Sequence, residues 1–319
     1  AEFIDFRRNM TVAEAIAHIK KTGDDKETVY VGYVTDEKRM LLGSIRIEKL
    51  LFSDDGAVLG DIMNTDFVCA GTHDDEETVA DTISKYDLFA LPIVDREQRL
   101  VGIVTVDDAI DVIEDAATED IEMMGAITPT DKPYLKTSVA ELWKNRIPWL
   151  ILLMISATFT GMIISSFEDA LSRLVVLTAY IPMLMGTGGN SGSQSSVTVI
   201  RALSLDELKF SDIGRVLWKE LRTSILCGIA LAVVCFAKIW LVDRLLLGNT
   251  DITLMVDMVV CLAMFVTVLL AKTVGAVLPM EAKVLKLDPA VMAAPLISTL
   301  TDTVSLLIFF QFARLILKL

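Results

Sequence analysis

Histidine and cysteine, common ligands of transition metals, are scarce in this chain of 319 residues. The two histidines, His18 and His73, lie far apart, which argues against a histidine metal centre and a histidine-based catalytic triad. The four cysteines show no metal-ligand spacing: Cys69, Cys227, Cys235 and Cys261. Three of them lie in apolar runs, so they are predicted to be small buried hydrophobic residues. Nothing in this pattern predicts an enzyme.

Basic side chains are also few in the first part of the chain. Residues 1–145 carry 31 acidic and 15 basic side chains, a net charge of −16, whereas residues 146–319 carry 12 acidic and 14 basic ones. The first part is therefore expected to be an acidic soluble module and the second a nearly neutral apolar one. The acidic excess excludes nucleic acid as a partner and favours divalent cations. Ordinary solvation of an acidic surface is the alternative.

The acidic module contains an internal duplication. Residues 11–16 predict the start of a helix, residues 29–34 and 41–45 predict strands, and a helix is expected near Glu48. The same order returns in residues 78–83, 90–94 and 100–104, with a helix from Asp107. A unit of about 60 residues repeated once predicts two α+β copies whose sheets pack together. We place the copies at residues 1–62 and 63–125.

The duplicated unit resembles a tandem pair of CBS domains. In that family the last strand commonly continues as Gly-x-x-Thr/Ser-x-x-Asp, which holds an adenosine nucleotide. The second copy has this pattern as Gly102, Thr105 and Asp108, whereas the first copy has Arg46 and Lys49 at the positions of the hydroxyl and the carboxylate. The resemblance thus implies at most one nucleotide site, for ATP, at Thr105 and Asp108.

Carboxylates are concentrated in the second copy and just after it. On a helix from Asp107, the side chains of Asp108, Asp111 and Asp115 share one face. Like charges in this arrangement repel each other unless a cation lies between them, and oxygen ligands suit Mg2+ or Ca2+. A cation sensor and a solvated helix face both fit the pattern.

A linker joins the two parts at residues 126–147. It contains Pro129 and Pro133, and Ser138 and Glu141 have the spacing of a capping box at a helix start. The helix from Ser138 to Arg146 is amphipathic and carries Trp143, which suits a membrane surface. It is expected either to be a plain interfacial helix or to transmit movement from the acidic module.

The membrane domain is placed at residues 148–319. Five apolar segments, the first of which begins one residue earlier, are long enough to cross a bilayer, which takes about 20 residues each. They are residues 147–167, 171–203, 217–242, 254–278 and 289–317. Lysine and arginine gather in the loops after the second and fourth segments, so those loops and the acidic module are expected in the cytoplasm. Five crossings then place the C-terminus outside.

The second segment is interrupted by a stretch rich in glycine and amide side chains, residues 182–202. It holds Gly186, Gly188, Gly189 and Gly192, together with Asn190. A break in a membrane helix is tolerated only where protein covers it or where it lines a wet cavity, so the stretch is a candidate polar path. Close helix packing through small residues is the alternative.

The sharpest ionisable group in the apolar part is Asp302, which lies in the middle of the fifth segment among hydroxyl side chains, with no lysine or arginine within ten residues. A carboxylate at such a position needs a proton, a cation or water, and a protonated Asp bonded to a neighbouring threonine is the alternative. Carbonyl groups near Gly186 and the Asp302 carboxylate would together suit a hydrated Mg2+. A two-fold dimer would supply two such carboxylates.

Several motifs together resemble the MgtE family of bacterial Mg2+ channels. They are GTGGNSGSQSS at residues 186–196, the Arg201-Ala202-Leu203 that follows it, Lys219-Glu220-Leu221, and LDPA with TLTD between Leu287 and Asp302. The resemblance implies a homodimeric Mg2+ importer of the bacterial inner membrane with a pore between the second and fifth spans. The resemblance also implies that the pore closes when cytosolic Mg2+ binds the CBS pair and the connecting plug helix from Ser138 to Arg146.

Carried over by position, the resemblance assigns three groups of residues. The pore residues are Gly186, Gly189, Asn190 and Asp302, with Glu168 and Glu220 near the pore ends. The carboxylates that hold regulatory Mg2+ are Asp75, Glu77, Asp87, Asp108, Asp111, Glu119 and Asp120.

This sequence departs from the family pattern in three places. Ser193 and Ala294 stand where relatives often have asparagine. The helical domain usual before the CBS pair is absent, so we expect a shortened chain or a short member of the family. A proton- or sodium-coupled exchanger of Mg2+, Mn2+ or Co2+ on the same scaffold is the alternative function.

Overall fold

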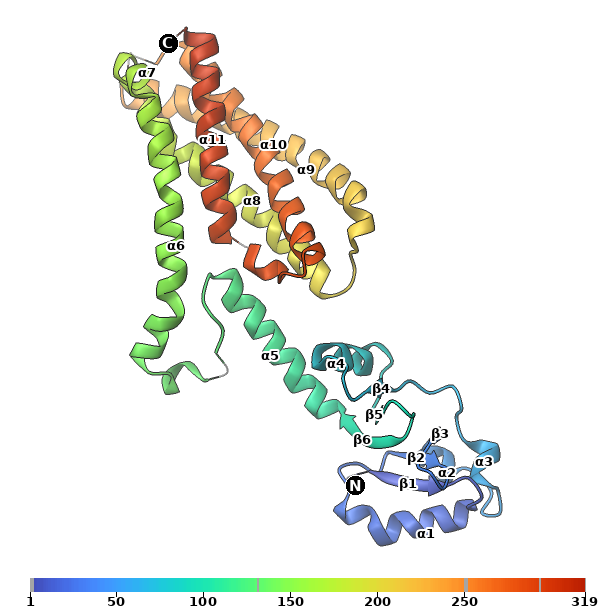
Figure 1. Cartoon of the computed structure of the whole chain (residues 1–319). Coiled ribbons are helices and arrows are strands. Elements are labelled where there is room, and N and C mark those ends of the chain that lie inside the picture. The colour runs from blue at the N-terminus through green and yellow to red at the C-terminus, as the bar shows by residue number, and fades with distance from the viewer. Residues whose placement is uncertain (1–2, 131, 250–251, 293, 319) are drawn as a thin grey trace. The chain divides into compact units, whose positions relative to one another are not determined.

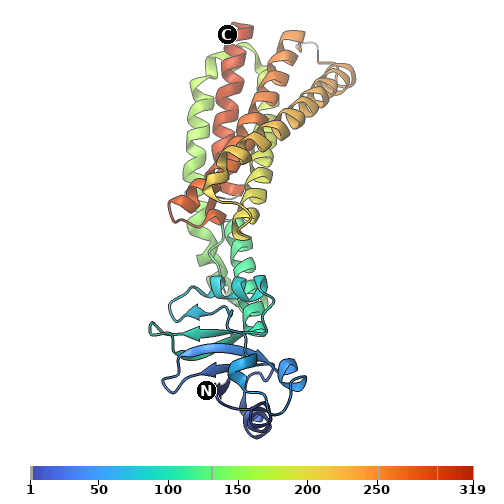
Figure 2. The ribbon, with the colours of Figure 1, turned by 90° about the vertical axis from the view of Figure 1, so that its right-hand side faces the viewer.

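The computed structural model describes residues 3–130, 132–249, 252–292 and 294–318. The chain divides into two compact units, Ala1–Thr118 and Glu119–Leu319. Figures 1 and 2 show strands and short helices in the first unit and long helices in the second. This confirms an α+β part followed by an all-helical part.

The first copy of the repeat forms a three-stranded sheet in the order β1-β2-β3. Strand β1 lies parallel to β2, and β2 lies antiparallel to β3. The elements are β1 (Ile4–Arg7), α1 (Val12–Thr22), η1 (Gly23–Asp25), β2 (Val31–Thr35), β3 (Leu41–Arg46), α2 (Ile47–Leu51) and α3 (Leu59–Ile62). The helix expected at residue 11 is capped by Thr11, whose side chain and that of Glu14 form a capping box. Strand β1, which has only four residues, was not predicted from the sequence.

The second copy repeats this plan in the sheet order β4-β5-β6. Its elements are β4 (Ala70–Gly71), α4 (Glu76–Lys85), β5 (Ala90–Val94), β6 (Leu100–Thr105) and α5 (Val106–Met124). Again the first, parallel strand was not predicted, because β4 has two residues and gives no periodic pattern. Helix α5 begins one residue before the expected Asp107 and continues past the boundary between the two units.

The two copies bury apolar side chains against each other. Phe3, Val31 and Tyr33 from the first copy pack with Val94 and Leu100 from the second. The Tyr33 hydroxyl donates a hydrogen bond to the Ala90 carbonyl oxygen over 3.1 Å. This shared core confirms that the duplicated unit folds as a pair.

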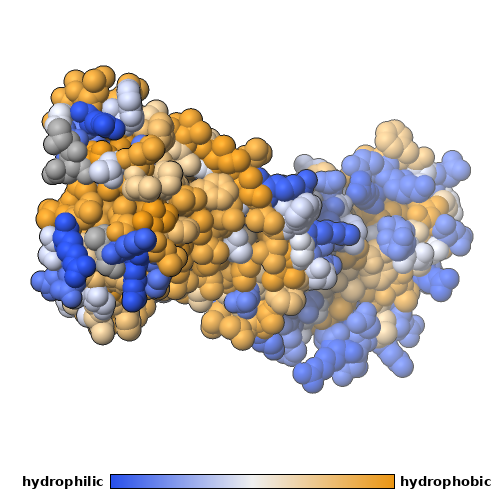
Figure 3. All heavy atoms as spheres, turned by 90° about the horizontal axis from the view of Figure 1, so that it is seen from above, coloured by the Kyte–Doolittle hydropathy of each residue, from blue (hydrophilic) through white to orange (hydrophobic). Residues whose placement is uncertain are grey.

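The second unit consists of long helices joined by short ones. Its elements are η2 (Tyr134–Lys136), α6 (Val139–Ser166), α7 (Glu168–Arg173), η3 (Val175–Tyr180), α8 (Ile181–Ser204), η4 (Phe210–Asp212), α9 (Ile213–Lys238), η5 (Ile239–Leu246), α10 (Leu254–Val284), η6 (Pro289–Met292) and α11 (Ala294–Leu317). Four stretches are long and apolar enough to cross a membrane: Val139–Ser166, Phe210–Leu246, Leu254–Val284 and Pro289–Leu317. Figure 3 shows hydrophobic side chains over most of the visible face of this unit.

Helix α8 is the least apolar of the five expected spans. This helix has 24 residues, which is long enough, but it is not among the stretches that are apolar enough to cross. Its glycine, serine and amide side chains account for the difference. Helix α8 therefore depends on its neighbours for cover, and it packs against α10 and α11.

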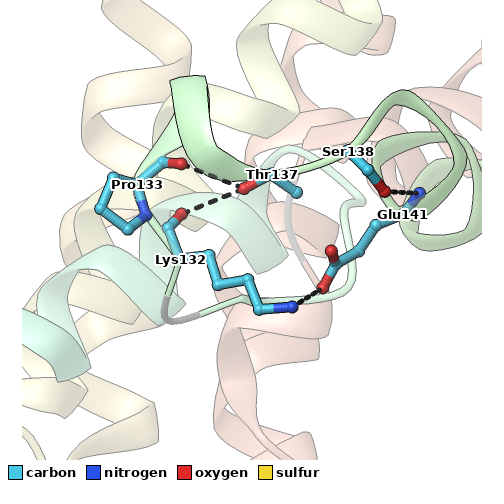
Figure 4. Close-up of polar contacts among 5 residues, drawn as sticks. All are labelled: Lys132, Pro133, Thr137, Ser138 and Glu141. Carbon is cyan, nitrogen blue, oxygen red and sulfur yellow. Dashed lines mark hydrogen bonds and ion pairs between the residues drawn. The ribbon is translucent and has the colours of Figure 1, made fainter.

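The helix expected over residues 138–146 is not separate from the first span. Helix α6 runs without interruption from Val139 to Ser166 and includes Pro148. Figure 4 shows that the capping box forms only in part. The Ser138 hydroxyl accepts a hydrogen bond from the Glu141 backbone N–H, whereas the Glu141 carboxylate pairs with the Lys132 ammonium over 2.7 Å. The Glu141 carboxylate thus pairs with Lys132 of the linker instead of capping the start of the helix.

Glycines bring α8 into close contact with α10 and α11. A Cβ on Gly188 would lie 2.6 Å from the Ser305 hydroxyl oxygen, and one on Gly192 would lie 2.7 Å from a methyl group of Ile297. On the α10 side, a Cβ on Gly275 would overlap the Gly192 backbone carbonyl oxygen. Small residues at these positions let the helix backbones touch.

Replacement Gly275→Ala should therefore separate α8 from α10, because the obstacle is backbone that no side-chain rotation relieves. We expect a loss of about 1–3 kcal/mol and a lower melting temperature of the purified protein in detergent. Gly161→Ala in α6 is the matched control, since nothing lies within 4 Å of a Cβ there. Equal melting temperatures for Gly275→Ala and wild type would contradict this packing.

Candidate functional site

Helix α8 has two different faces. Gly188, Gly189, Ser191, Gly192 and Ser195 are buried against neighbouring helices. Gly186, Asn190 and Gln194 are exposed and follow each other at intervals of four residues, which places them on one stripe. Close helix packing therefore applies to most of the glycines. The polar-path interpretation applies to the stripe, which is polar and uncovered within one chain.

The predicted break in the backbone is wrong. The structure is α-helical from Ile181 to Ser204, so Gly186 and Gly189 lie in a regular helix. The carbonyl oxygens of such a helix accept hydrogen bonds from amides four residues on. Gly189 is moreover buried, with Ser298 within 3.1–3.5 Å of a Cβ placed on it. The expected unwound carbonyl ligands are therefore replaced by an exposed stripe with one amide group at Asn190 and another at Gln194.

Asp302 lies on α11 and is half-buried. The hydroxyls around it are occupied, since Thr299 donates to the Pro295 carbonyl and Thr303 donates to the Thr299 carbonyl. Among the residues that the structure describes, no side chain hydrogen-bonds or ion-pairs with the Asp302 carboxylate. The structure therefore does not contain the alternative arrangement, in which Asp302 is hydrogen-bonded to a neighbouring threonine.

The depth of Asp302 follows from the packing of α8 on α11. Gly189 lies against Ser298, and the two helices run in opposite directions because Gly188 meets Ser305 while Gly192 meets Thr301. One turn from this level, toward the start of α8 and the end of α11, are Gly186 and Asp302. The Asp302 carboxylate therefore lies toward the Gly186 end of the polar stripe.

The two acidic residues assigned to the pore ends are in different surroundings. Glu168 is exposed at the start of α7. Glu220 lies on α9, and its carboxylate accepts a hydrogen bond of 2.6 Å from the buried Ser195 hydroxyl on α8. Glu220 is thus tied to the packed face of α8, opposite the exposed stripe.

The assigned nucleotide residues contact each other. The Thr105 hydroxyl at the end of β6 donates a hydrogen bond of 2.7 Å to the Asp108 carboxylate in the first turn of α5. Thr105 is 4% exposed. The family pattern of hydroxyl and carboxylate is therefore built in the second copy.

The assigned sensor carboxylates serve local structure or lie on the surface. Asp75 caps α4 by accepting from the Glu77 backbone N–H over 3.1 Å. Asp87 follows this helix with a positive φ of 50°. Asp111 and Glu119 are exposed on α5. Within the described part of the chain, no three His, Cys, Asp or Glu side chains converge as a metal-binding group.

Asp120 is the sensor carboxylate that makes a contact inside the second unit. It accepts a hydrogen bond of 3.0 Å from the Ser204 hydroxyl at the end of α8. Burial raises the pKa of Asp120, the Ser204 hydrogen bond lowers it, and the nearby Asp288 carboxylate raises it. Asp288 was not assigned from the sequence, although it stands in the LDPA motif, because only the fold brings it toward α5.

Apolar side chains hold the same end of α5 in place. Met123 and Met124 pack against Ile200 of α8 and Ala290 of η6. The linker adds polar contacts, since the Thr130 backbone N–H donates to the Glu122 carboxylate over 2.9 Å. The Thr128 backbone N–H donates to the Asn145 carbonyl of α6 over 3.0 Å. The last turns of α5 thus contact the end of α8 and η6, and the linker that follows contacts the start of α6.

A second cluster that sequence reasoning missed lies at the other end of α8. The π-helix η5 brings Lys238 and Asp243, five residues apart, into an ion pair of 2.7 Å. The Tyr180 hydroxyl, just before α8, donates to the same carboxylate over 3.2 Å. This cluster ties the start of α8 to the end of α9.

Comparison with known proteins identifies the scaffold. A family model described as a divalent cation transporter, MgtE, matches residues 181–312, and a CBS domain model matches residues 59–115. The magnesium transporter MgtE of Thermus thermophilus is 39% identical over 318 residues, which are 99% of this chain and 68% of that protein. The chain belongs to the MgtE family of magnesium transporters.

Further relatives agree with this membership. The magnesium transporter MgtE of Enterococcus faecalis is 33% identical over 99% of this chain and 68% of its own length, and that of Bacillus subtilis is 37% identical over 96% and 66%. The MgtE chain is therefore a membrane transporter of magnesium and, as expected, not an enzyme.

Two solved structures are similar to part of this chain. The crystal structure of the cytosolic domain of the Mg2+ channel MgtE in complex with ATP is 42% identical over 35% of this chain and 45% of that one, with a TM-score of 0.34. The soluble part of a magnesium transporter is 42% identical over 37% and 46%, with a TM-score of 0.36.

The raised pKa of Asp120 predicts how stability depends on pH. A carboxyl group whose pKa is higher in the folded state binds more protons there, so stability falls as pH rises through that pKa. In Mg2+-free detergent, the melting temperature should decrease as pH rises from the ordinary carboxyl value of 3.8 through the raised one. Asp120→Asn should flatten this part of the curve, while Glu207→Gln, at an exposed carboxylate, should not. An unchanged curve in Asp120→Asn would count against the buried carboxylate.

Proposed function

We propose that this MgtE chain is a Mg2+ channel that works as a homodimer, with the exposed stripe of α8 and Asp302 of α11 along its ion path. The observation that carries the proposal is the position of Gly186, Asn190 and Gln194 on a helix too polar to face lipid. Polar groups at membrane depth must meet protein or water. A second copy placed against this stripe covers both stripes and leaves a wet path between them.

The chemistry of the path suits a hydrated ion. Mg2+ sheds water reluctantly and is usually held through its water molecules by a few oxygen ligands. Two Asp302 carboxylates, one from each copy, supply the negative charge that one carboxylate cannot. The Asn190 and Gln194 amides supply hydrogen-bonding groups for the water shell. Because the backbone of α8 is helical, these side chains rather than unwound carbonyls make the polar lining.

The gate in this proposal is the inner end of α8. Asp120 and Asp288 repel each other where α5 packs on α8 and η6, and a cation bound near them relieves that repulsion. Cytosolic Mg2+ then favours the arrangement in which α5 is held against α8, and the path closes. The other sensor carboxylates form no metal-binding group among the described residues, and we place their Mg2+ sites between two copies: Asp75, Glu77, Asp87, Asp108, Asp111 and Glu119.

The orientation rests on the distribution of basic side chains. Lys209 and Lys286 lie in the connections after α8 and α10, and the adjoining helix ends carry Arg201, Arg215 and Lys283. Positive side chains stay on the cytoplasmic side, so we place the CBS pair in the cytoplasm of a bacterial cell and the C-terminus outside. The Thr105 and Asp108 pair is the proposed nucleotide site for ATP.

Asp302→Ala should abolish Mg2+ uptake by proteoliposomes, and Asp302→Asn should reduce it by about tenfold or more, because the charge that attracts the ion is lost. Asp169→Asn, at an exposed carboxylate of α7, is the control and should transport as wild type does. Uptake that survives Asp302→Ala would refute the assigned path. A Mg2+ current in the absence of any other ion gradient separates the channel from a proton- or sodium-coupled exchanger.

The gating proposal predicts that Mg2+ protects the soluble part against protease and lowers uptake when it is present on the cytoplasmic side. Both effects follow from cation-bridged carboxylates that compact the acidic module. Asp302→Ala is the control, because it lacks the path but keeps the sensor residues and should show the same protection. Protection that does not increase with Mg2+ would refute cation sensing and leave transport itself untouched.

A further inference from the structure

Two cysteines from different helices meet in the second unit, and the proposed ion path does not use them. Cys235 lies on α9 and is 4% exposed, whereas Cys261 lies on α10 and is partly exposed. Both pack in the same cluster of apolar side chains. They are 26 residues apart in the sequence, which predicted only small hydrophobic residues at these positions. The fold therefore creates a pair of thiols that no sequence motif announces.

Close packing of α9 on α10 (Figure 1) brings the two cysteines together. A Cβ on Gly228 of α9 would lie 2.8 Å from the Phe265 ring and 3.3 Å from the Phe265 carbonyl oxygen, so the two helices touch there. The helices are antiparallel, since Val216 and Met280 belong to one cluster on the other side of this contact. Two turns onward along α9 and one turn back along α10 lead to the two cysteines.

The side chains of the two cysteines contact each other. The Cys235 and Cys261 thiols are hydrogen-bond partners. The Cys261 thiol also donates a hydrogen bond of 3.4 Å to the Asp257 carboxylate. Each thiol has one proton, so both contacts are satisfied when Cys235 donates to the Cys261 sulfur and Cys261 donates to Asp257. The two sulfur atoms are neighbours in this arrangement.

Charged groups surround the thiol pair. Lys238, Asp243 and Asp257 all lie within electrostatic range of Cys235, and Lys238 and Asp243 form the ion pair of 2.7 Å described above. A thiol reacts as its thiolate, which needs polar surroundings of this kind. Among the described residues, no group of three side chains here is arranged to hold a metal ion, so the chemistry left to the pair is a bond between the two sulfur atoms.

We propose that Cys235 and Cys261 form a thiol–disulfide site, which a small disulfide oxidises to a covalent bond between α9 and α10. One protein thiolate attacks the small disulfide, forms a mixed disulfide and releases one small thiol. The other protein thiolate attacks the protein sulfur of this mixed disulfide, releases the second small thiol and closes the bond. Two electrons pass from the protein to the small disulfide, and the two thiol protons leave on the released thiols.

The bond covalently reinforces a region that polar contacts hold in the reduced protein. It joins α9 to α10 beside Tyr180, whose hydroxyl donates to Asp243 just before the start of α8. A cross-link of this kind stabilises a protein by restricting its unfolded chain. In the orientation proposed above, this end of the unit lies on the outer side, and disulfides persist in oxidising surroundings such as the bacterial periplasm. The inference rests on the thiol contact and does not require the proposed ion path.

The reagent 2,2′-dipyridyl disulfide tests the site, because each attack by a thiol releases one pyridine-2-thione, which is measured by its absorbance. For the folded Cys69→Ser/Cys227→Ser variant in detergent, we expect two thiones per chain, no attached pyridylthio group and a mass lower by two hydrogen atoms. With Cys235→Ser or Cys261→Ser added, we expect one thione and one attached group. The Cys235→Ser/Cys261→Ser variant is the control, since Cys69 and Cys227 lie in different units and should only carry attached groups.

The melting temperature provides a second measurement. Oxidation of the pair should raise it by about 4 °C or more, dithiothreitol should reverse the shift, and Cys235→Ser should show none. Linked peptides that contain Cys235 and Cys261, from oxidised wild-type protein, would support the site without any variant. Release of no thione by the folded protein, stable attached groups on both cysteines or a bond between two chains overturns it. Mg2+ uptake enters none of these readouts, so failure of the proposed channel leaves the result unchanged.

Discussion

The membrane unit depends on the contact of glycine backbones between α8 and its neighbours. Because Gly188 and Gly192 carry no side chain of their own, α8 approaches α10 and α11 closely and buries its small residues on one face. Its amide side chains are thereby left on the opposite face. A membrane helix cannot keep such a face against lipid, so the same close packing that stabilises one chain creates the need for a polar partner or a wet path.

Periodicity and hydropathy predicted most of the architecture, since the duplication and the spans outside α8 are long regular patterns. The unpredicted strands β1 and β4 have four and two residues, too few for any period. The glycine-rich stretch was expected to interrupt the second span, and glycine does disfavour helices by about 1 kcal/mol per residue. Tertiary packing reversed this preference, since the contact of Gly192 with Gly275 is possible only for a helix without side chains there.

The candidate site was predictable in part for a similar reason. Asp302 stands out in a sequence because it is a charge among apolar residues, and no contact has to be known to notice it. Asp288 gains its importance only beside Asp120, which lies on another helix far away in the chain. Such residues are linked by the fold and carry no signal in any one segment.

Two carboxylates of the membrane unit have different surroundings. Asp243 is paired with the Lys238 ammonium, which cancels its charge and ties the start of α8 to the end of α9. Among the described residues Asp302 has no ion-pair partner, and its negative charge is available to an ion. An unpaired carboxylate beside a polar stripe directs cations to its position, because attraction in a medium of low dielectric constant is strong when no opposite charge cancels it.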